Sequence, residues 1–308
     1  MQLLGSRCSI NTAVGTCALA VCLLVTAGQL AAAPRQAPSF DQDPIGKLAR
    51  EETALDAGTG SALMAQAGET GSALGFPVGV KRVGKHVRDG FEQAEYDEVT
   101  EMDSKGRVSS ITQFDKDGRL RTAIRLDSPP RSVLKVSGPA AIRTAQRSAQ
   151  AAGLTLGTPS ATDADQATGG WTVHWNRVAA GIRVRGDETR VQVWPDGRIQ
   201  SMARVEHDLA PAPGESINAD SAKQAASDNL DRWFAGRNSD YAIKGMALEW
   251  VEPNGAFDPS LSATTSVPYR LAWVTEVKPS GDAANAMWLM TLFVDAGDGN
   301  IIGGDFVE

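Results

Sequence analysis

The stretch from Trp171 to Ile199, which reads WTVHWNRVAAGIRVRGDETRVQVWPDGRI, constrains the fold more than any other part of the chain. It contains three segments in which apolar and polar residues alternate with a period of two. Gly181 separates the first two segments, and the turn sequence Pro195-Asp196-Gly197 follows the third. This pattern predicts an antiparallel meander. The stretch contains no acid–base pair, nucleophile or metal-binding cluster, so it predicts a scaffold and not a reaction.

The N-terminus has the layout of a secretory signal peptide. Arg7 precedes an apolar run over residues 13–27, and the small residues 30–33 then lead into Pro34. A charged start, an apolar middle and an A-x-A site predict export, with cleavage of residues 1–33 near Ala33 and a secreted or cell-envelope location. The alternative is a retained anchor, but polar and glycine residues interrupt the run, and a spanning helix needs about 20 apolar residues.

The cysteines and the charge narrow the class of protein further. Cys8, Cys17 and Cys22 all lie in the leader, so the mature chain is expected to have neither a disulfide framework nor thiol chemistry. Lipid attachment at Cys22 is an alternative, although Val21 is a poor residue to precede such a cysteine. Cleavage removes one positive charge and moves the formal net charge from −7 to −8. An acidic exported chain argues against nucleic acid as a partner.

The chain after the leader divides into four predicted regions. Residues 34–75 are rich in Ala, Gly, Ser and Thr and are interpreted as a flexible linker, with ordered structure beginning near Phe76. Short strands separated by Asp-Gly and Lys-Gly turns predict a small β-meander block over residues 76–130. Two further units are expected over residues 131–210 and 211–308.

Each of these two units is expected to be a helix followed by strands. Helices are predicted over Gly138–Gly153 and Asn218–Phe234, where apolar residues recur at helical spacing. Strands follow each helix, and the starts of the two helices are about 80 residues apart. The predicted fold class is therefore α+β, with two units that each pack a helix on an antiparallel sheet, preceded by the β block.

Known catalytic and metal-binding motifs do not account for this chain. His86, His174 and His207 belong to no HExxH pair, and neither a nucleophile elbow nor a phosphate-binding loop is present. The Asp-rich segments 115–118 and 295–300 lack the full calcium ligand set, so hairpin turns are the better interpretation, with calcium as the alternative. No catalytic residue, metal or cofactor is predicted.

One face of the meander is a candidate partner-binding surface. Alternation places Trp171, Val173 and Trp175 on one face, against a helix. An aromatic side chain beside two arginines on the opposite face suits an acidic or extended partner, whereas an ordinary solvated or covered face is the alternative. The predicted binding residues are His174, Arg183, Arg185, Gln192 and Trp194.

Two stretches of the chain resemble the PepSY family and the related pro-region domains of fungalysin and thermolysin-type peptidases. The first contains the residues GIRVRGD from Gly181, which are similar to the "G-I-P-V-x-G-x" stretch of these domains, followed by VQV and DGRI. The second contains INADSA from Ile217, LEWV from Leu248, YRLAW from Tyr269 and FVDAGDGNIIG from Phe293. Arg183 stands where the family has proline. Together the two stretches cover residues 138–308.

The resemblance implies a protein that is not an enzyme and that binds a protein partner, with regulation or inhibition of a secreted peptidase as the expected role. No HExxH peptidase sequence follows in this chain, so a pro-region role within the same chain is not expected. Two alternatives remain open. One is an extracellular hydrolase whose carboxylates converge only in three dimensions. The other is a structural component of the cell envelope.

Overall fold

The computed structural model describes residues 50–89, 94–128, 135–165, 168–235, 240–254, 267–281 and 289–307. The predicted signal peptide, its cleavage near Ala33 and the three cysteines lie outside these residues. The helices are α1 (Ala57–Ala73), α2 (Gly138–Ala151) and α3 (Ala219–Phe234). The strands before α3 are β1 (Arg50–Ala54), β2 (Lys81–Asp89), β3 (Ala94–Met102), β4 (Val108–Phe114), β5 (Leu120–Arg125), β6 (Ala161–Ala164), β7 (Trp171–Ala179), β8 (Ile182–Val193) and β9 (Ile199–Val205). Those after it are β10 (Tyr241–Val251), β11 (Arg270–Pro279), β12 (Leu289–Asp295) and β13 (Ile301–Val307).

The fold-class prediction of two helix-on-sheet units preceded by a separate β block is wrong. The 13 strands of the described part form one mixed sheet. Strand β5 pairs with β9 through Thr122 and Ala203, which joins the expected β block to the strands that follow α2. Strand β8 pairs in parallel with β10 through Val184 and Trp250, which joins the C-terminal strands. Alternation within a strand identifies the strand but not its distant partner. The sequence pattern therefore did not predict these two pairings.

Helix α1 occupies a stretch for which a flexible linker was expected. Its sequence contains several glycines, which lower helix propensity. Two features offset that cost. The Asp56 side chain accepts hydrogen bonds from the N–H groups of Gly58 and Thr59, each 3.0 Å long. Leu63 and Ala67 are buried in the core shared with α2. The helix therefore depends on its cap and on tertiary packing more than on its own sequence.

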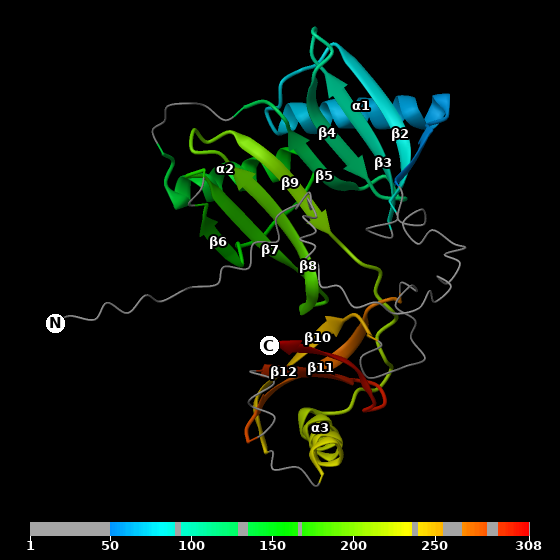
Figure 1. Ribbon diagram of the computed structural model, residues 1–308, viewed down its shortest axis with the longest axis vertical. Helices are drawn as coiled ribbons and strands as arrows, with labels where there is room; N and C mark the ends of the chain where they lie inside the picture. The colour runs from blue at the N-terminus through cyan, green and yellow to red at the C-terminus, as the bar shows by residue number, and fades with distance from the viewer. Residues whose placement is uncertain are drawn as a thin grey trace, which may run out of the picture. The chain divides into compact units, whose positions relative to one another are not determined.

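Helices α2 and α3 confirm the predicted helical segments. Ala141, Ala145 and Ala149 of α2 are fully buried, and these small side chains let the helix lie close to the sheet. Gly153 has a φ of 83° just beyond the end of α2, a conformation that glycine adopts without steric cost. The Asn218 side chain caps α3 by accepting a 2.9 Å hydrogen bond from the N–H of Ser221. Figure 1 shows α1 and α2 against the strands from β2 to β9 and α3 beside the strands from β10 to β12.

Cross-strand rows explain where the main core lies. One row of directly paired residues crosses seven strands and faces α1 and α2. Because facing residues of neighbouring strands share a side, the rows on either side of it face away from the helices. The helix-facing row consists of Gly84, Val99, Thr112, Ala123, Met202, Val191 and Val173. Its four larger apolar side chains are almost fully buried, and each contributes roughly 1.5–3 kcal/mol; they are those of Val99, Met202, Val191 and Val173.

The edge of β13 is protected by a side chain. The Asn254 amide donates a 2.9 Å hydrogen bond to the carbonyl of Gly304, and its carbonyl accepts one of 3.3 Å from the N–H of Gly304. The backbone N–H of Asn254 donates to the carbonyl of Ile302. Unpaired strand edges recruit other chains. Asn254 therefore satisfies backbone groups that an added strand would otherwise pair with.

Candidate functional site

His174 and Gln192 lie on the sheet face that points away from α1 and α2. Two rows of paired residues, which flank the helix-facing row, form this open face. The first row consists of Val83, Thr100, Ile111, Ile124, Ser201, Gln192 and Thr172. The second consists of Lys85, Glu98, Gln113, Thr122, Ala203, Arg190 and His174. No helix of the described ranges packs on either row.

His174 does not stand free on the open face. Its Nδ1 lies 3.1 Å from a carboxylate oxygen of Glu188, and its Nε2 lies 3.2 Å from one of Asp163. Gln192 is exposed and accepts a 2.7 Å hydrogen bond from the hydroxyl of Ser201. Both predicted residues are therefore on one surface, where His174 is partly held by its acidic neighbours.

Arg183 and Arg185 bind carboxylates of the C-terminal strands. Arg185 lies 3.5 Å from Glu249 and 3.0 Å from Asp305, and its guanidinium lies 5.6 Å from the centre of the Phe293 ring. Arg183 lies 3.8 Å from the other oxygen of Glu249. These arginines connect β8 to β10, β12 and β13 within the chain. Arg183 is the more exposed of the two, with half of its side-chain surface accessible.

Trp194 is not on the open face. Strand β8 ends at Val193, and Trp194 begins the turn, where its N–H donates to the carbonyl of Arg198. Its side chain is only 3% exposed. The guanidinium groups of Arg125 and Arg198 lie 4.9 Å and 4.8 Å from its ring centre. Trp194 lies one position past the end of β8, where the alternation of a strand no longer sets the direction of a side chain.

A buried carboxylate anchors the open face near its β1 edge. Glu98 is 3% exposed and binds Arg50 at 2.9 Å, Lys85 at 3.1 Å and Gln113 at 3.0 Å. Burial alone raises the pKa of Glu98, but the hydrogen bond from Gln113 and the pairing with Lys85 and Arg50 outweigh it and hold the pKa below its usual value. This part of the face is a fixed, charged arrangement rather than a set of mobile side chains.

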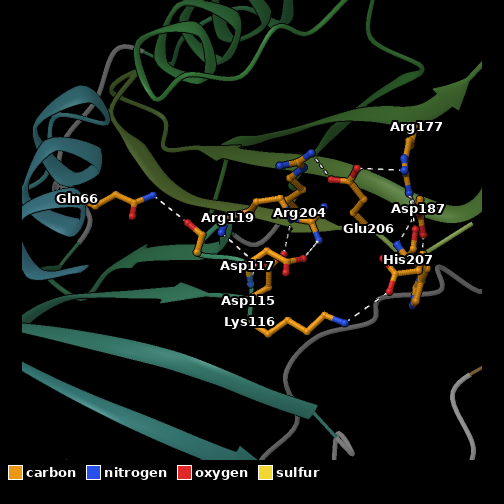
Figure 2. Close-up of polar contacts among 12 residues, drawn as sticks. Gln66, Asp115, Lys116, Asp117, Arg119, Arg177, Asp187, Arg204, Glu206 and His207 are labelled. Carbon is orange, nitrogen blue, oxygen red and sulfur yellow. Dashed lines mark hydrogen bonds and ion pairs between the residues drawn. The ribbon is translucent and has the colours of Figure 1, made fainter. Parts of the chain in front are cut away.

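Sequence reasoning missed a second polar cluster, which is centred on Asp187. The Asp187 side chain is fully buried. It accepts hydrogen bonds of 2.9 Å from Arg177 and from the backbone N–H of His207, and its other oxygen binds the His207 ring at Nδ1. The His207 ring stacks on Tyr269, with ring centres 4.6 Å apart and planes 9° from parallel. Figure 2 shows Arg177, Asp187 and His207 in this arrangement.

These contacts shift the pKa of each titratable member. Burial alone raises the pKa of Asp187, but hydrogen bonds from His207 and Arg177 outweigh it, so the pKa lies below its ordinary value. The hydrogen bond with Asp187 raises the pKa of His207, against the opposing effect of burial. Burial, with Glu252 and Asp187 nearby, raises the pKa of Tyr269. The cluster therefore favours a charged Asp187–His207 pair beside a neutral tyrosine.

The Asp187 cluster continues into the turn between β4 and β5. Glu206 lies 3.1 Å from Arg177 and also pairs with Arg204. Lys116 of the turn lies 3.6 Å from Asp208, and Gln66 of α1 donates a 3.0 Å hydrogen bond to the carbonyl of Gly118 (Figure 2). Polar contacts thus link α1, the β4–β5 turn and the segment after β9. These contacts hold together a helix, a turn and a loop that are far apart in the sequence.

In the two Asp-rich turns, the carboxylate oxygens of Asp115 and Asp295 bind backbone N–H groups and arginine side chains of the same chain. Asp115 accepts hydrogen bonds from the N–H groups of Asp117 and Arg119 and pairs with the Arg119 side chain at 2.8 Å. Asp295 accepts from the N–H of Gly297 and pairs with Arg270 at 2.6 Å. These are the contacts of hairpin turns, as the sequence predicted. In the described part of the chain, no three His, Cys, Asp or Glu residues gather as a possible metal site.

Two open hollows lie beside α2. The first, of about 570 Å³, lies between α2 and the segment after it, and is lined by Arg143, Gln146, Arg147, Gln150, Leu154, Thr155 and Leu156. The second, of about 590 Å³, lies between α1 and α2 and contains Glu69 and Arg82. Neither hollow brings two carboxylates together, which is the arrangement that the hydrolase alternative requires.

Comparisons with known proteins leave the family of this chain unassigned. A scan against models of protein families finds no match, and a search of curated proteins finds none either. A solved structure of the Bacillus megaterium YpeB C-terminal domain matches with 12% identity and a TM-score of 0.43, over 83% of this chain and 99% of that one. An uncharacterized protein from Eubacterium rectale matches with 12% identity and a TM-score of 0.37, over 78% of this chain and 80% of that one. Similarity at this level identifies neither an activity nor a partner.

A separate finding concerns membranes. Within the described ranges, no helix is both long enough and apolar enough to cross a bilayer.

Proposed function

We propose that this protein is an exported, non-enzymatic binding protein that captures a protein partner on the open face of its sheet. The observation that carries this proposal is the composition of that face. Val83, Ile111 and Ile124 form an apolar strip along one row, which Thr100 interrupts between Val83 and Ile111, and Val83 is 38% exposed. The neighbouring row carries His174 together with the charged side chains of Lys85, Glu98 and Arg190. An apolar strip beside a polar row is the composition of a protein-binding surface.

The resemblance to PepSY domains favours a secreted peptidase as the partner, with regulation or inhibition as the outcome. A face that binds through apolar contact and ion pairs needs no reacting group, which agrees with a non-enzymatic role. Export agrees with the signal-peptide layout of residues 1–33. N-terminal sequencing of the protein recovered from the culture medium tests export, because cleavage near Ala33 exposes Pro34 or a residue close to it.

Two matched triple variants test the open face. The first is His174→Ala/Arg190→Ala/Gln192→Ala on strands β7 and β8. The control is Lys223→Ala/Gln224→Ala/Arg232→Ala on the exposed side of α3. Candidate peptidases from the native secretome are assayed for binding and for residual activity in the presence of each variant. We expect the first variant to weaken binding and inhibition by about tenfold or more, and the control to leave both unchanged.

A charge placed in the apolar strip provides a second measurement. Val83→Glu introduces a carboxylate at a side chain that is already partly exposed, so the melting temperature should change little. Binding should nevertheless be lost, because a partner would have to bury the new charge. Equal binding by wild type, Val83→Glu and the first triple variant would contradict the proposed surface. Robust turnover of glycoside, ester or peptide substrates by the purified chain would contradict the non-enzymatic role.

A further inference from the structure

The hollow between α2 and the segment after it carries two exposed arginines that pair with no carboxylate of the described residues. Arg143 and Arg147 are exposed, and within the described ranges neither has a carboxylate at ion-pair distance. Nε of Arg147 donates a 3.3 Å hydrogen bond to the backbone carbonyl of Arg143, and among the described residues the terminal nitrogens of both side chains remain available. Most arginines of the described sheet bind carboxylates, so this pair on α2 differs from them in an acidic protein.

The sequence around this hollow has a local charge opposite to that of the whole chain. Residues 129–162 contain Arg131, Lys135, Arg143 and Arg147 and no Asp or Glu, although the formal net charge of the chain is −7. Arg143 and Arg147 are four residues apart on one side of α2, where like charges repel each other. An anionic ligand would relieve that repulsion, so the helix gains stability when the site is filled.

The rest of the hollow suits an extended polypeptide. Gln146 and Gln150 follow the arginines along α2 and offer carboxamide groups, while Leu154 and Leu156 provide apolar surface on the opposite side. The facing segment is held in place, because Gln146 donates a 3.2 Å hydrogen bond and Trp175 a 3.1 Å hydrogen bond to the carbonyl of Gly157. The hollow therefore has fixed walls, hydrogen-bonding groups and an apolar side.

The spacing of the two arginines selects the form of the ligand. Residues four apart on a helix are separated by about 6 Å along its axis. In an extended chain, alternate side chains on one side are about 6.6 Å apart. We propose that this hollow binds an extended acidic segment of a partner protein, with carboxylates at alternate positions paired to Arg143 and Arg147. This site lies on the helix side of the sheet, so the inference is independent of the open face.

Labelled peptides test the inference directly. The probe is a fluorescein-labelled peptide of alternating Glu and Ser, and its control is the matching peptide of alternating Gln and Ser. Fluorescence anisotropy with the full chain should show binding of the acidic peptide that weakens as salt is added. Arg143→Gln/Arg147→Gln should weaken it by about fivefold to tenfold, as expected for two partly exposed ion pairs. Arg232 is an exposed arginine on α3 that likewise has no carboxylate partner among the described residues, so the Arg232→Gln variant should bind as wild type does.

Several outcomes would overturn the inference. In one, the wild type and Arg143→Gln/Arg147→Gln bind the acidic peptide with equal affinity. In another, the wild type binds the Gln-Ser peptide as tightly as the acidic peptide. If a single-stranded oligothymidylate bound more tightly than the acidic peptide, the ligand of this hollow would be a nucleic acid and the proposal of an acidic polypeptide would be wrong. Loss of fold is monitored by the melting temperature, which should not fall in the double variant because it removes a like-charge pair. The open-face triple variant should still bind the peptide, which separates this site from the proposed partner surface.

Discussion

The ring of His207 stacks on the ring of Tyr269 while its Nδ1 binds the buried carboxylate of Asp187. His207 follows β9, and Tyr269 immediately precedes β11. The backbone reinforces this contact, because the N–H of Tyr269 donates to the carbonyl of Asp208 and the N–H of Ala210 donates to the carbonyl of Tyr269. Stacking and backbone hydrogen bonds thus hold the segment after β9 against the start of β11, and the charge pair holds it against β8.

Stability should depend on the protonation of His207. Its pKa is raised in the folded protein by Asp187, so the stabilisation is fully present below about pH 6.5, the ordinary value for histidine. It is lost as the pH rises through the raised pKa. Arg177, Glu252 and Tyr269 surround the pair, and Tyr269 remains neutral across this range. Urea unfolding over a pH series should show a decline above about pH 6.5 in the wild type. His207→Gln should lack this decline, and a parallel decline in that variant would contradict the assignment.

Replacing the buried carboxylate should cost more than replacing an exposed one. Asp187→Asn removes the counter-charge of protonated His207 and leaves Arg177 paired with Glu206 alone among the described carboxylates, and we expect a loss of about 3 kcal/mol in the free energy of unfolding. Asp208→Asn is the matched control. The Asp208 side chain is 70% exposed, and its ion pair with Lys116 is long, at 3.6 Å. Its effect should stay below about 0.5 kcal/mol. Chemical denaturation measures both, and similar losses would show that Asp187 is not the centre of this cluster.

Trp194 should behave as a core residue. Its ring is buried between Arg125 and Arg198, so Trp194→Ala should lower the free energy of unfolding by about 3–5 kcal/mol. His174→Ala on the open face should change it far less, because the contacts of His174 are with carboxylates at the surface. Thermal unfolding distinguishes the two. An unchanged melting temperature for Trp194→Ala would return that residue to the candidate binding surface.

Removing the side chain that protects β13 should destabilise its edge and promote association. Asn254→Ala loses two hydrogen bonds to Gly304, which corresponds to about 1–3 kcal/mol. The exposed edge should also favour pairing between molecules. Size-exclusion chromatography at increasing concentration should show larger species for Asn254→Ala than for the wild type. A monomer at all concentrations with unchanged stability would mean that Asn254 does not protect this edge.

Local sequence determined the local structure of this protein. Alternation and the Pro195-Asp196-Gly197 turn specified β7 to β9, and small apolar residues at helical spacing specified α2, with Gly153 beyond its end. The Asn218 cap specified the start of α3. Each of these signals depends on residues within one turn or one strand. The same signals placed His174 and Gln192 on one face, because side-chain direction within a strand follows its period of two.

Only the tertiary structure decided which strands meet and which side chains share a site. The pairing of Thr122 with Ala203 and of Val184 with Trp250 depends on which surfaces are buried together, and distant strands carry no local mark of their partners. Asp187 and His207 meet through the pairing of β8 with β9, whereas Tyr269 joins them only because β8 pairs with β10 and β10 with β11. The burial of Trp194 has the same origin, since its two arginine neighbours come from different parts of the chain. Backbone patterning therefore specified the elements, whereas long-range packing specified the continuous sheet and the sites on it.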